Sequence, residues 1–349
     1  MNTTSGLWKN TTSEDTTTYD YFDVSEPCHY GSDASQFLPV LYSLFFVVGL
    51  PGNMLVLWMM LRGAQMKTMT DVSLLNLVIA DLLLIFTLPF QAHYARDTWV
   101  FGNVMCTLVL GVFYIGFYAA IFFIVLISID RYLAIVHSLF VLNIRTKAFG
   151  ILACMVVWMI AVAASFPELL HFEGKAYDTG VVCTAYQAIM YHSYGRSTAL
   201  FKMNVFGMMI PLGIVGFCYS MVLRNLKTST KLAVRLVVVV TCVFFCCWIP
   251  YNIAAFLKAL ELKGTLPQEC EISKGIHLML QVTQAVAYSH SCLNPFLYVF
   301  LGENYKQHLA RLLLQTPCVR AQCIKNYLTQ VEGSVDPHIE NVDELSVAI

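Results

Sequence analysis

Seven long apolar stretches, separated by short polar connections, set the pattern of this chain. They contain no Asp, Glu, Lys or Arg, apart from Asp81 in the second, and they cover 37–61, 72–95, 104–129, 148–167, 203–223, 236–257 and 275–302. About 20 residues in a helix span the ~30 Å hydrocarbon core of a bilayer. The pattern therefore predicts an all-α membrane protein, a single bundle of seven transmembrane helices over 37–302.

The overall composition supports a membrane protein. Hydrophobic residues make up 58% of the chain and charged residues only 12%, whereas soluble domains carry roughly 25% charge. The mean hydropathy is +0.64. The formal net charge is −1, so nucleic acid is not expected as a partner.

The distribution of basic residues predicts the orientation in the membrane. Lys and Arg follow the first, third and fifth stretches and recur in the tail, whereas the N-terminal arm carries six acidic residues against Lys9. Basic residues concentrate on the cytoplasmic side of membrane proteins. We therefore expect a multi-pass plasma-membrane protein with an extracellular N-terminus and a cytoplasmic C-terminus.

The segments outside the bundle have distinct characters. Residues 1–36 read as an exposed acidic arm with glycosylation acceptors at Asn2 and Asn10. Residues 303–315 form a short amphipathic pattern, expected to lie as an eighth helix on the inner membrane surface. In the cytoplasmic tail, 316–349, Cys318 and Cys323 are palmitoylation candidates, with unmodified thiols as the alternative.

Two tyrosines lie among the acidic residues of the arm. Tyr19 and Tyr21 fall within the segment Thr-Tyr-Asp-Tyr-Phe-Asp at 18–23. One interpretation is an ordinary solvated acidic tail. The other is a sulfated, anionic strip that attracts a basic protein ligand through long-range electrostatics.

Four cysteines fall on the predicted outer side, where disulfides form. They are Cys28, Cys106, Cys183 and Cys270, and four cysteines allow three pairings. We favour Cys106–Cys183 and Cys28–Cys270, which would tie the second outer loop to the third span and the arm to the third outer loop.

Polar residues inside the apolar stretches are the first candidates for function. An ionisable side chain such as Asp81 is costly in the membrane unless it faces the bundle interior. Asn53 and Asn294 could meet it through water or an ion, or the three could form a purely structural clasp. Pro89, among several prolines in these stretches, is expected to kink its helix, which suits a bundle that changes shape.

Three motifs together resemble the rhodopsin-class (class A) G protein-coupled receptors. They are Asp-Arg-Tyr at 130–132, Cys-Trp-Ile-Pro at 247–250 and Asn-Pro-Phe-Leu-Tyr at 294–298. Within that class, residues 19–315 resemble the CC-type chemokine receptors. The matches are Thr-Leu-Pro-Phe at 87–90, Trp-Val-Phe-Gly at 99–102, Asp-Arg-Tyr-Leu-Ala-Ile-Val-His at 130–137, Ala-Val-Arg-Leu at 233–236, Ser-His-Ser-Cys-Leu-Asn-Pro at 289–295, the extra cysteine pair and the acidic arm.

The resemblance implies a signalling mechanism by position. Asp130 would hold Arg131 in the inactive state and release it to a Gα subunit when the sixth span swings outward. Trp248 would be the rotamer-sensitive residue beneath the ligand. The implied set for activation and G-protein coupling is Asp130, Arg131, Tyr132, Tyr219, Trp248, Pro250, Asn294, Pro295 and Tyr298, with Tyr219 and Tyr298 closing around Arg131 in the active state.

The resemblance also implies a ligand pocket and an allosteric sodium site. A chemokine would contact Tyr19 and Tyr21 and insert its N-terminus among Tyr42, Gln91, Phe113, Tyr114, Tyr118, Tyr251 and Gln284. Asp81 and Asn294 would hold sodium, although Ala120 offers no side-chain oxygen there. Two positions depart from the family: Gln284 stands where Glu is usual, and Gln91 where many members carry Trp.

The expected function is that of a chemokine receptor acting on a heterotrimeric G protein of the inhibitory class, with calcium mobilisation and cell migration as outcomes. Arrestin and membrane lipid are further expected partners. A scavenging or viral decoy receptor and a receptor for another peptide are the alternatives. A transporter is disfavoured because no inverted repeat is visible. An enzyme is disfavoured because no metal-ligand or nucleophile motif appears, and no cofactor is expected beyond the sodium ion.

Overall fold

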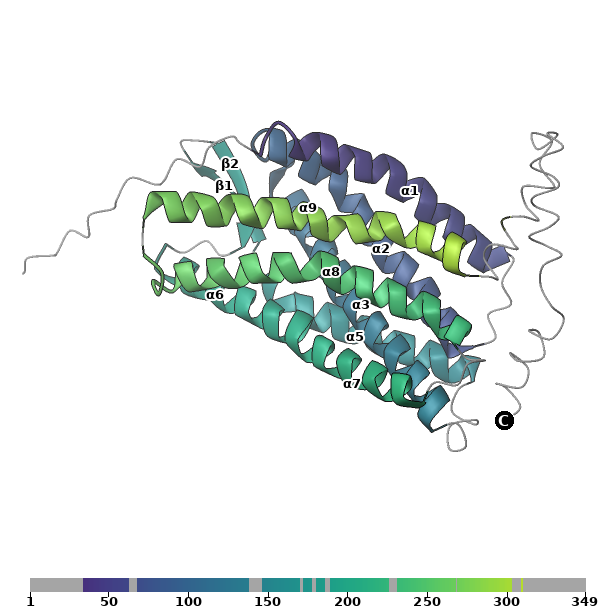
Figure 1. Cartoon of the computed structure of the whole chain (residues 1–349). Coiled ribbons are helices and arrows are strands. Elements are labelled where there is room, and N and C mark those ends of the chain that lie inside the picture. The colour runs from purple at the N-terminus through teal and green to yellow at the C-terminus, as the bar shows by residue number, and fades with distance from the viewer. Residues whose placement is uncertain are drawn as a thin grey trace, which may run out of the picture.

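The computed structural model describes residues 34–62, 68–137, 146–169, 172–177, 180–185, 189–225, 231–267, 269–302 and 309. These residues form a bundle of seven helical rods lying side by side, which Figure 1 shows along its length. The rods are α1 (Leu38–Arg62), α2 (Met69–Arg96), α3 (Gly102–Val136), α5 (Lys147–Leu169), the continuous α6 (Ile189–Asn204), η1 (Val205–Met209) and α7 (Ile210–Asn225), α8 (Lys231–Leu262), and α9 (Cys270–Leu301).

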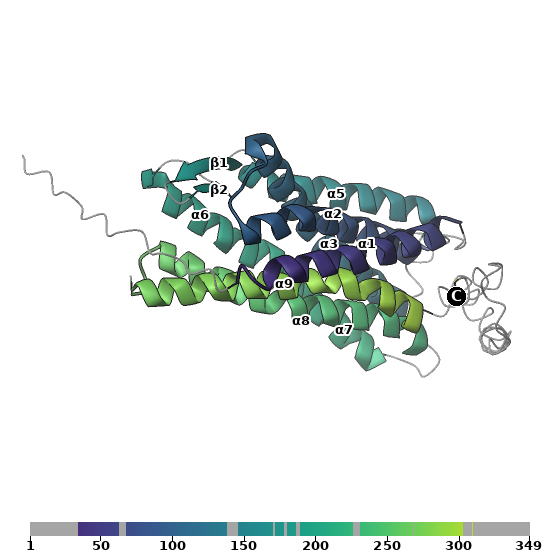
Figure 2. The same ribbon diagram turned by 90° about the horizontal axis from the view of Figure 1, so that it is seen from above.

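The predicted seven-helix bundle is confirmed. Six of the described rods are long and apolar enough to cross a membrane, judged by length and composition. The seventh is α9, whose 32 residues include the buried polar side chains of His290, Ser291 and Asn294. Figures 1 and 2 both show α9 lying alongside α1, which closes the ring of helices.

The helices extend beyond the apolar stretches that predicted them. The third continues through Asp130 and Arg131 to Val136, and the fifth rod begins at Ile189, ahead of Arg196 and Lys202. A charged residue near the end of a membrane helix can reach the polar interface along its long side chain. Such a residue ends a charge-free run in the sequence without ending the helix.

A short β-hairpin, which the sequence did not predict, accompanies the helical bundle. Strand β1 (Phe172–Tyr177) pairs antiparallel with β2 (Gly180–Ala185), and Gly174 lies opposite Cys183. Each strand has six residues, too few for an alternating pattern to stand out from loop sequence. We call the end of the bundle that carries this hairpin the hairpin end and the opposite end the Arg131 end.

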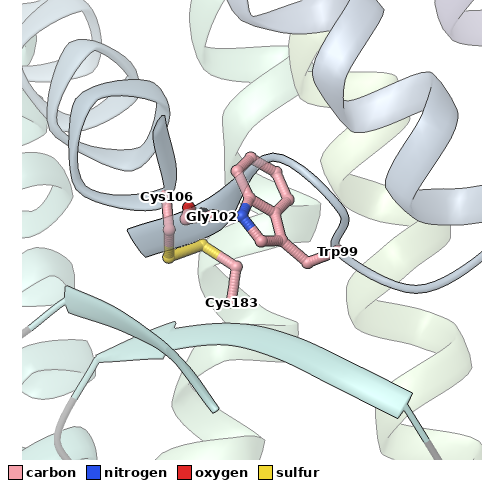
Figure 3. Close-up of a disulfide and its surroundings, with 4 residues drawn as sticks. All are labelled: Trp99, Gly102, Cys106 and Cys183. Atoms are coloured by element: carbon pink, nitrogen blue, oxygen red, sulfur yellow. Dashed lines mark hydrogen bonds between the residues drawn. A yellow bond between two sulfur atoms is a disulfide. The ribbon is translucent and has the colours of Figure 1, made fainter. Parts of the chain in front are cut away.

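A disulfide anchors the hairpin to the bundle. Cys106, in the first turns of α3, is bonded to Cys183 of β2 with 5.6 Å between their Cα atoms, as Figure 3 shows. This confirms the predicted pairing. Beside it, the Trp99 indole donates a hydrogen bond to the Gly102 carbonyl at 2.9 Å. Cys270 is also disulfide-bonded.

Several predicted features lie outside the described residues. They are Cys28 (the expected partner of Cys270), Asn2, Asn10, Tyr19, Tyr21, Cys318, Cys323 and the amphipathic segment 303–315 apart from Leu309.

We predict that Gly102→Ala destabilises the protein. Gly102 has φ +75°, in the left-handed region, although an added Cβ would meet nothing within 4 Å. The conformation alone should lower the free energy of unfolding by about 1–2 kcal/mol, measured as the thermal midpoint in detergent. Gly213→Ala is the matched control, because Gly213 also has open space but lies within α7 at ordinary φ. A Gly→Ala change inside a helix should leave the free energy of unfolding unchanged or raise it by up to ~1 kcal/mol. An equal loss of stability in Gly102→Ala and Gly213→Ala would contradict the role assigned to the left-handed conformation of Gly102.

Candidate functional site

A three-residue contact closes the Arg131 end of the bundle. The Asp130 carboxylate is buried and accepts a hydrogen bond from the Thr70 hydroxyl. Arg131 lies 3.5 Å from the same carboxylate oxygen, measured from Nη2, and donates to the Thr70 hydroxyl. Thr70 therefore joins both members of the pair and attaches the end of α3 to the start of α2.

The local sequence places Thr70 there. Thr68 caps α2 by a reciprocal capping box, in which its hydroxyl accepts from the Asp71 N–H at 3.2 Å and its own N–H donates to the Asp71 carboxylate at 3.0 Å. A capping box fixes the helix start and hence the direction of the first turn. Thr70 was not predicted from the sequence, because a threonine in a first turn carries no signal of its own.

Tyr219, one of the two tyrosines predicted to close on Arg131, lies within electrostatic range of the Arg131 guanidinium. The Tyr219 hydroxyl lies 3.3 Å from the Thr241 hydroxyl, which joins α7 to α8. Tyr298 is fully buried in α9. The Tyr132 hydroxyl lies 2.9 Å from Nε2 of His137. Arg131 is thus held within α2 and α3, as the resemblance implies for an inactive receptor.

The buried Asp81 carboxylate is the polar centre of the bundle. Ser291 donates to its Oδ1 at 2.9 Å and Asn294 to its Oδ2 at 2.7 Å, and Nε2 of His290 lies 3.3 Å from Oδ1. A buried carboxylate is tolerated only when such groups replace its lost hydration. The predicted meeting of Asp81 and Asn294 is confirmed, whereas Ser291 and His290 were identified only as parts of a family motif.

Asn53 reaches this centre indirectly. Its side-chain amide donates to the Ser291 carbonyl at 2.8 Å and to the Gly49 carbonyl at 2.9 Å. Asn53 therefore fixes the backbone of α9 against α1 rather than contacting Asp81. The Oδ1 atoms of Asn53 and Asn294 are buried and have no hydrogen-bond partner within the described part of the chain.

His290 connects the polar centre to Trp248. The buried indole of Trp248 donates to Nδ1 of His290 at 3.2 Å. Because His290 also faces Asp81, one side chain links the predicted rotamer-sensitive tryptophan to the predicted ion site. Phe244 packs on both rings, at centroid distances of 5.8 Å from Trp248 and 5.0 Å from His290.

Phe117 holds the opposite side of Trp248. The two ring centroids are 4.4 Å apart. The π-helical turn η1 brings Gly207 against Phe117, where an added Cβ would lie 2.6 Å from the ring. Only a glycine allows this approach, so the fifth rod supports the tryptophan through Phe117.

An aromatic group lies on the hairpin side of Trp248 and contains three of the predicted ligand residues. Tyr42 and Phe113 each lie 5.7 Å from the ring of Tyr288, and Tyr251 lies 5.7 Å from Trp248. The Tyr288 hydroxyl is 3.2 Å from that of Thr87. We call Tyr42, Thr87, Phe113, Tyr251 and Tyr288 the tyrosine group; Tyr288 and Thr87 were missed by sequence reasoning.

The remaining predicted ligand residues adjoin the tyrosine group to different degrees, and the Gln284 side chain hydrogen-bonds Tyr288. Tyr114 packs its ring on Phe113 at 5.3 Å. Gln91 and Gln284 are half-buried, each one helical turn from a member of the tyrosine group. Tyr118 packs its ring on Phe117 and Phe122 of α3, and an added Cβ at Gly207 of η1 would lie 3.5 Å from its ring.

Two prolines of the predicted activation set lie in the helices that carry Trp248 and Asn294. Pro250 lies in α8 two residues after Trp248, and Pro295 follows Asn294 in α9. A proline inside a helix leaves a carbonyl of the preceding turn without its backbone donor, which makes a local change of bend less costly. Pro250 thus lies near Trp248, and Pro295 lies next to Asn294, which binds Asp81.

Comparison with known proteins identifies the family. Residues 52–298 match the family described as 7 transmembrane receptor (rhodopsin family). The chain is 40% identical over 308 residues to C-C chemokine receptor type 3 of Cavia porcellus, covering 85% of each protein. It is also 40% identical over 316 residues to human C-C chemokine receptor type 1, covering 87% of this chain and 88% of the relative.

The chain therefore belongs to the rhodopsin family of G protein-coupled receptors, which are multi-pass proteins of the plasma membrane and not enzymes. Within that family its similarity is to the C-C chemokine receptors.

We predict that Ser291→Ala lowers stability by removing one donor to Asp81. Leaving a buried charged group short of a hydrogen bond costs about 1–3 kcal/mol, measurable as a lower thermal midpoint in detergent. Ser289→Ala is the control, two residues away on the same helix, because its hydroxyl donates to the Val286 carbonyl of its own helix at 2.6 Å and meets only a thiol, Cys247 Sγ at 3.6 Å, on another helix. A loss in Ser289→Ala as large as that in Ser291→Ala would contradict the assigned role of Ser291.

Proposed function

We propose that this protein is a signalling chemokine receptor that activates a heterotrimeric G protein of the inhibitory class, leading to calcium mobilisation and cell migration. Two observations carry the proposal: contacts run from the tyrosine group through Trp248 and His290 to Asp81, and at the Arg131 end of the same bundle Arg131 is held on Asp130 and Thr70. The identity to C-C chemokine receptors supports the ligand class.

The proposed mechanism is a shift between two arrangements of the bundle. The chemokine globule contacts the N-terminal arm, including sulfated Tyr19 and Tyr21, and its N-terminal segment contacts the tyrosine group. A ligand shifts the equilibrium only by the difference in its affinity for the two arrangements. Repacking of Trp248 moves α8 outward, and Arg131 leaves Asp130 to meet the Gα subunit.

The proposed function also implies how the protein is oriented in the membrane. The hairpin end faces outside the cell and the Arg131 end faces the cytoplasm. Basic residues in the connections near the Arg131 end support that direction. The amphipathic segment 303–315 and the palmitoylated Cys318 and Cys323 then lie on membrane lipid, and arrestin uses the same cytoplasmic face.

We include an allosteric sodium site at Asp81 in the proposal. Sodium is a hard cation that prefers oxygen ligands. The buried Oδ1 atoms of Asn53 and Asn294 fit that requirement, because each lacks a partner among the described residues. Ala120 supplies no oxygen, so Asp81 and Asn294 are the main candidate ligands. A bound cation would supply positive charge that stabilises the inactive arrangement.

The experiment that tests the function measures inhibition of cAMP production in cells expressing this chain, against a panel of CC and other chemokines. We expect one or a few chemokines to inhibit, and pertussis toxin to abolish the response. Arg131→Ala should remove it, because the Gα contact is lost. Arg224→Ala, an exposed arginine at the end of α7, is the control and should retain it.

Other outcomes would favour other functions. The double variant Tyr19→Phe/Tyr21→Phe should weaken potency without reducing the maximal response, since the arm acts in capture. Chemokine uptake without any change in cAMP would instead make the protein a scavenger. Absence of binding by every chemokine in the panel would refute the ligand class.

We predict that Thr70→Val raises signalling without ligand. Valine has the shape of threonine but cannot donate to Asp130 or accept from Arg131. Hydrogen bonds to charged groups contribute about 1.5–3 kcal/mol, and ~1.4 kcal/mol corresponds to a tenfold change in an equilibrium, so basal nucleotide exchange should rise by at least about tenfold. Ser220→Ala, which removes an exposed hydroxyl bonded within α7, should leave the basal rate unchanged. A basal rate in Thr70→Val equal to or below that of the unmodified receptor would show that Thr70 does not restrain Arg131.

A further inference from the structure

Helix α5 lies along α2 through contacts that repeat once per helical turn. The Trp158 indole donates to the Asn76 side-chain oxygen at 2.8 Å, and the Cys154 sulfur lies 3.9 Å from the Ser73 hydroxyl. One turn nearer the Arg131 end, Gly150 of α5 continues the series against the first residue of α2. Residues four apart on α5 form one face of that helix, and this face is packed on α2 down to the start of both helices.

At Gly150 the two helices meet backbone to backbone. Gly150 is buried, and a Cβ added to it would lie 3.0 Å from the Cα of Met69 and 3.3 Å from the Cβ of Met69. Carbon atoms in contact are optimally separated by about 3.5–4.0 Å. Because the nearest atom belongs to the backbone, it cannot turn aside as the end of a flexible side chain would. Any residue other than glycine at position 150 must therefore move the first turn of α2 by a few tenths of an ångström.

The first turn of α2 carries the residue that restrains Arg131. Thr70 directly follows Met69, and its buried hydroxyl donates to Asp130 and accepts from Arg131. This turn is held as a unit, because the capping box fixes its start and the Ser73 hydroxyl donates to the Met69 carbonyl at 2.9 Å. A shift of the Met69 backbone is therefore passed on to Thr70.

Helix α5 is itself held in place and cannot easily move away from α2. Trp158 is bonded to Asn76 of α2, and its ring centroid lies 5.6 Å from that of Phe123 of α3. At the start of α5, the Thr146 hydroxyl accepts from the Phe149 N–H at 3.3 Å, which caps the first turn. Pressure at Gly150 would therefore act on the first turn of α2, where Thr70 lies.

We propose that Gly150 is a positioning residue for signalling: it lets α5 approach α2 closely enough to place the Thr70 hydroxyl where it serves both Asp130 and Arg131. This inference rests on the proposed function, in which release of Arg131 activates the G protein. It gives α5 a part in setting how strongly the receptor signals without ligand. A side chain at position 150 would displace Thr70 from its two partners and favour the release of Arg131.

The first test measures the restraint on Arg131 in the purified receptor, without chemokine or G protein. The arginine reagent p-hydroxyphenylglyoxal modifies accessible guanidinium groups, and the modified fraction at Arg131 is read from the mass of its peptide. The exposed Arg224 of the same chain is the internal reference for the rate. We expect Gly150→Ala to raise the relative rate at Arg131 about threefold, which is half of a tenfold change in free energy, because both bonds of Thr70 are weakened and neither is removed.

Two variants calibrate this measurement. Gly213→Ala is the matched control and should leave the rate at Arg131 unchanged, because a Cβ added to this residue of α7 would meet nothing within 4 Å. Thr70→Val removes both bonds and should raise the rate at least about tenfold. An unchanged rate in Gly150→Ala, or an equal rise in Gly213→Ala, would overturn the proposal. A lower thermal midpoint of Gly150→Ala without a change at Arg131 would overturn it too, since it would show that Gly150 only stabilises the fold.

A compensating variant covers the case in which Gly150→Ala folds poorly. Met69→Ala removes the Met69 Cγ, which an added Cβ at position 150 would meet at 3.4 Å, so the double variant Gly150→Ala/Met69→Ala has more room to fold. The contact with the Met69 Cα at 3.0 Å remains, and the double variant should therefore react faster at Arg131 than Met69→Ala alone. Equal rates in Met69→Ala with and without Gly150→Ala would overturn the proposal.

The second test asks whether Gly150 acts on signalling through Thr70. Basal nucleotide exchange by the G protein should rise about threefold in Gly150→Ala. Adding Gly150→Ala to Thr70→Val should raise the exchange rate no further, because the hydroxyl that the added methyl displaces is already absent. Independent sites would instead multiply their two effects, and that outcome would refute the role of Gly150 in placing Thr70. If the unmodified receptor and every variant fail to drive exchange on any Gα subunit, the proposed function fails, while the rates at Arg131 still decide whether Gly150 maintains the restraint.

Discussion

The bundle depends on a single buried carboxylate in its middle. Asp81 lies on α2, and the groups that compensate its charge, Ser291, Asn294 and His290, all come from α9. Burying a charge is costly unless its partners are correctly placed. The register of α2 against α9 is therefore fixed to within a fraction of a turn. Asn53 then fixes α1 to the same segment of α9 through the Ser291 carbonyl.

The need of the buried Asp81 carboxylate for well-placed partners also makes it sensitive to changes at neighbouring residues. His290 lies between Asp81 and Trp248, so a change at either neighbour alters the hydrogen bonding available to the other. Trp248 is packed between Phe117 and Phe244, and packed cores tend to switch between discrete arrangements instead of deforming gradually. The tyrosine group and Asp81 are thus joined through side chains with few alternative positions.

The sequence predicted those features that depend on composition and on single motifs. The seven spans and the contact of Asp81 with Asn294 followed from hydropathy and the cost of a buried charge. Topology placed four cysteines on one side and left three pairings, and the favoured Cys106–Cys183 bond is the one present. Thr70, Tyr288 and the role of His290 were missed, because each acts across a helix pair whose register no local pattern reveals. The hairpin was missed since its strands are short.

The π-helical turn Val205–Met209 has a consequence for how this receptor can diversify. A π turn accommodates one more residue than an α-helical turn, which rotates everything beyond it by about 100° relative to an unbroken helix. The faces of α6 and α7 are thereby set in different phases, although they belong to one continuous rod. A side chain of α6 therefore faces a different neighbour from the one that an unbroken helix continuing from α7 would give it. One extra residue in the backbone thus changes which face of the rod meets the bundle at the hairpin end without changing the face that meets it at the Arg131 end.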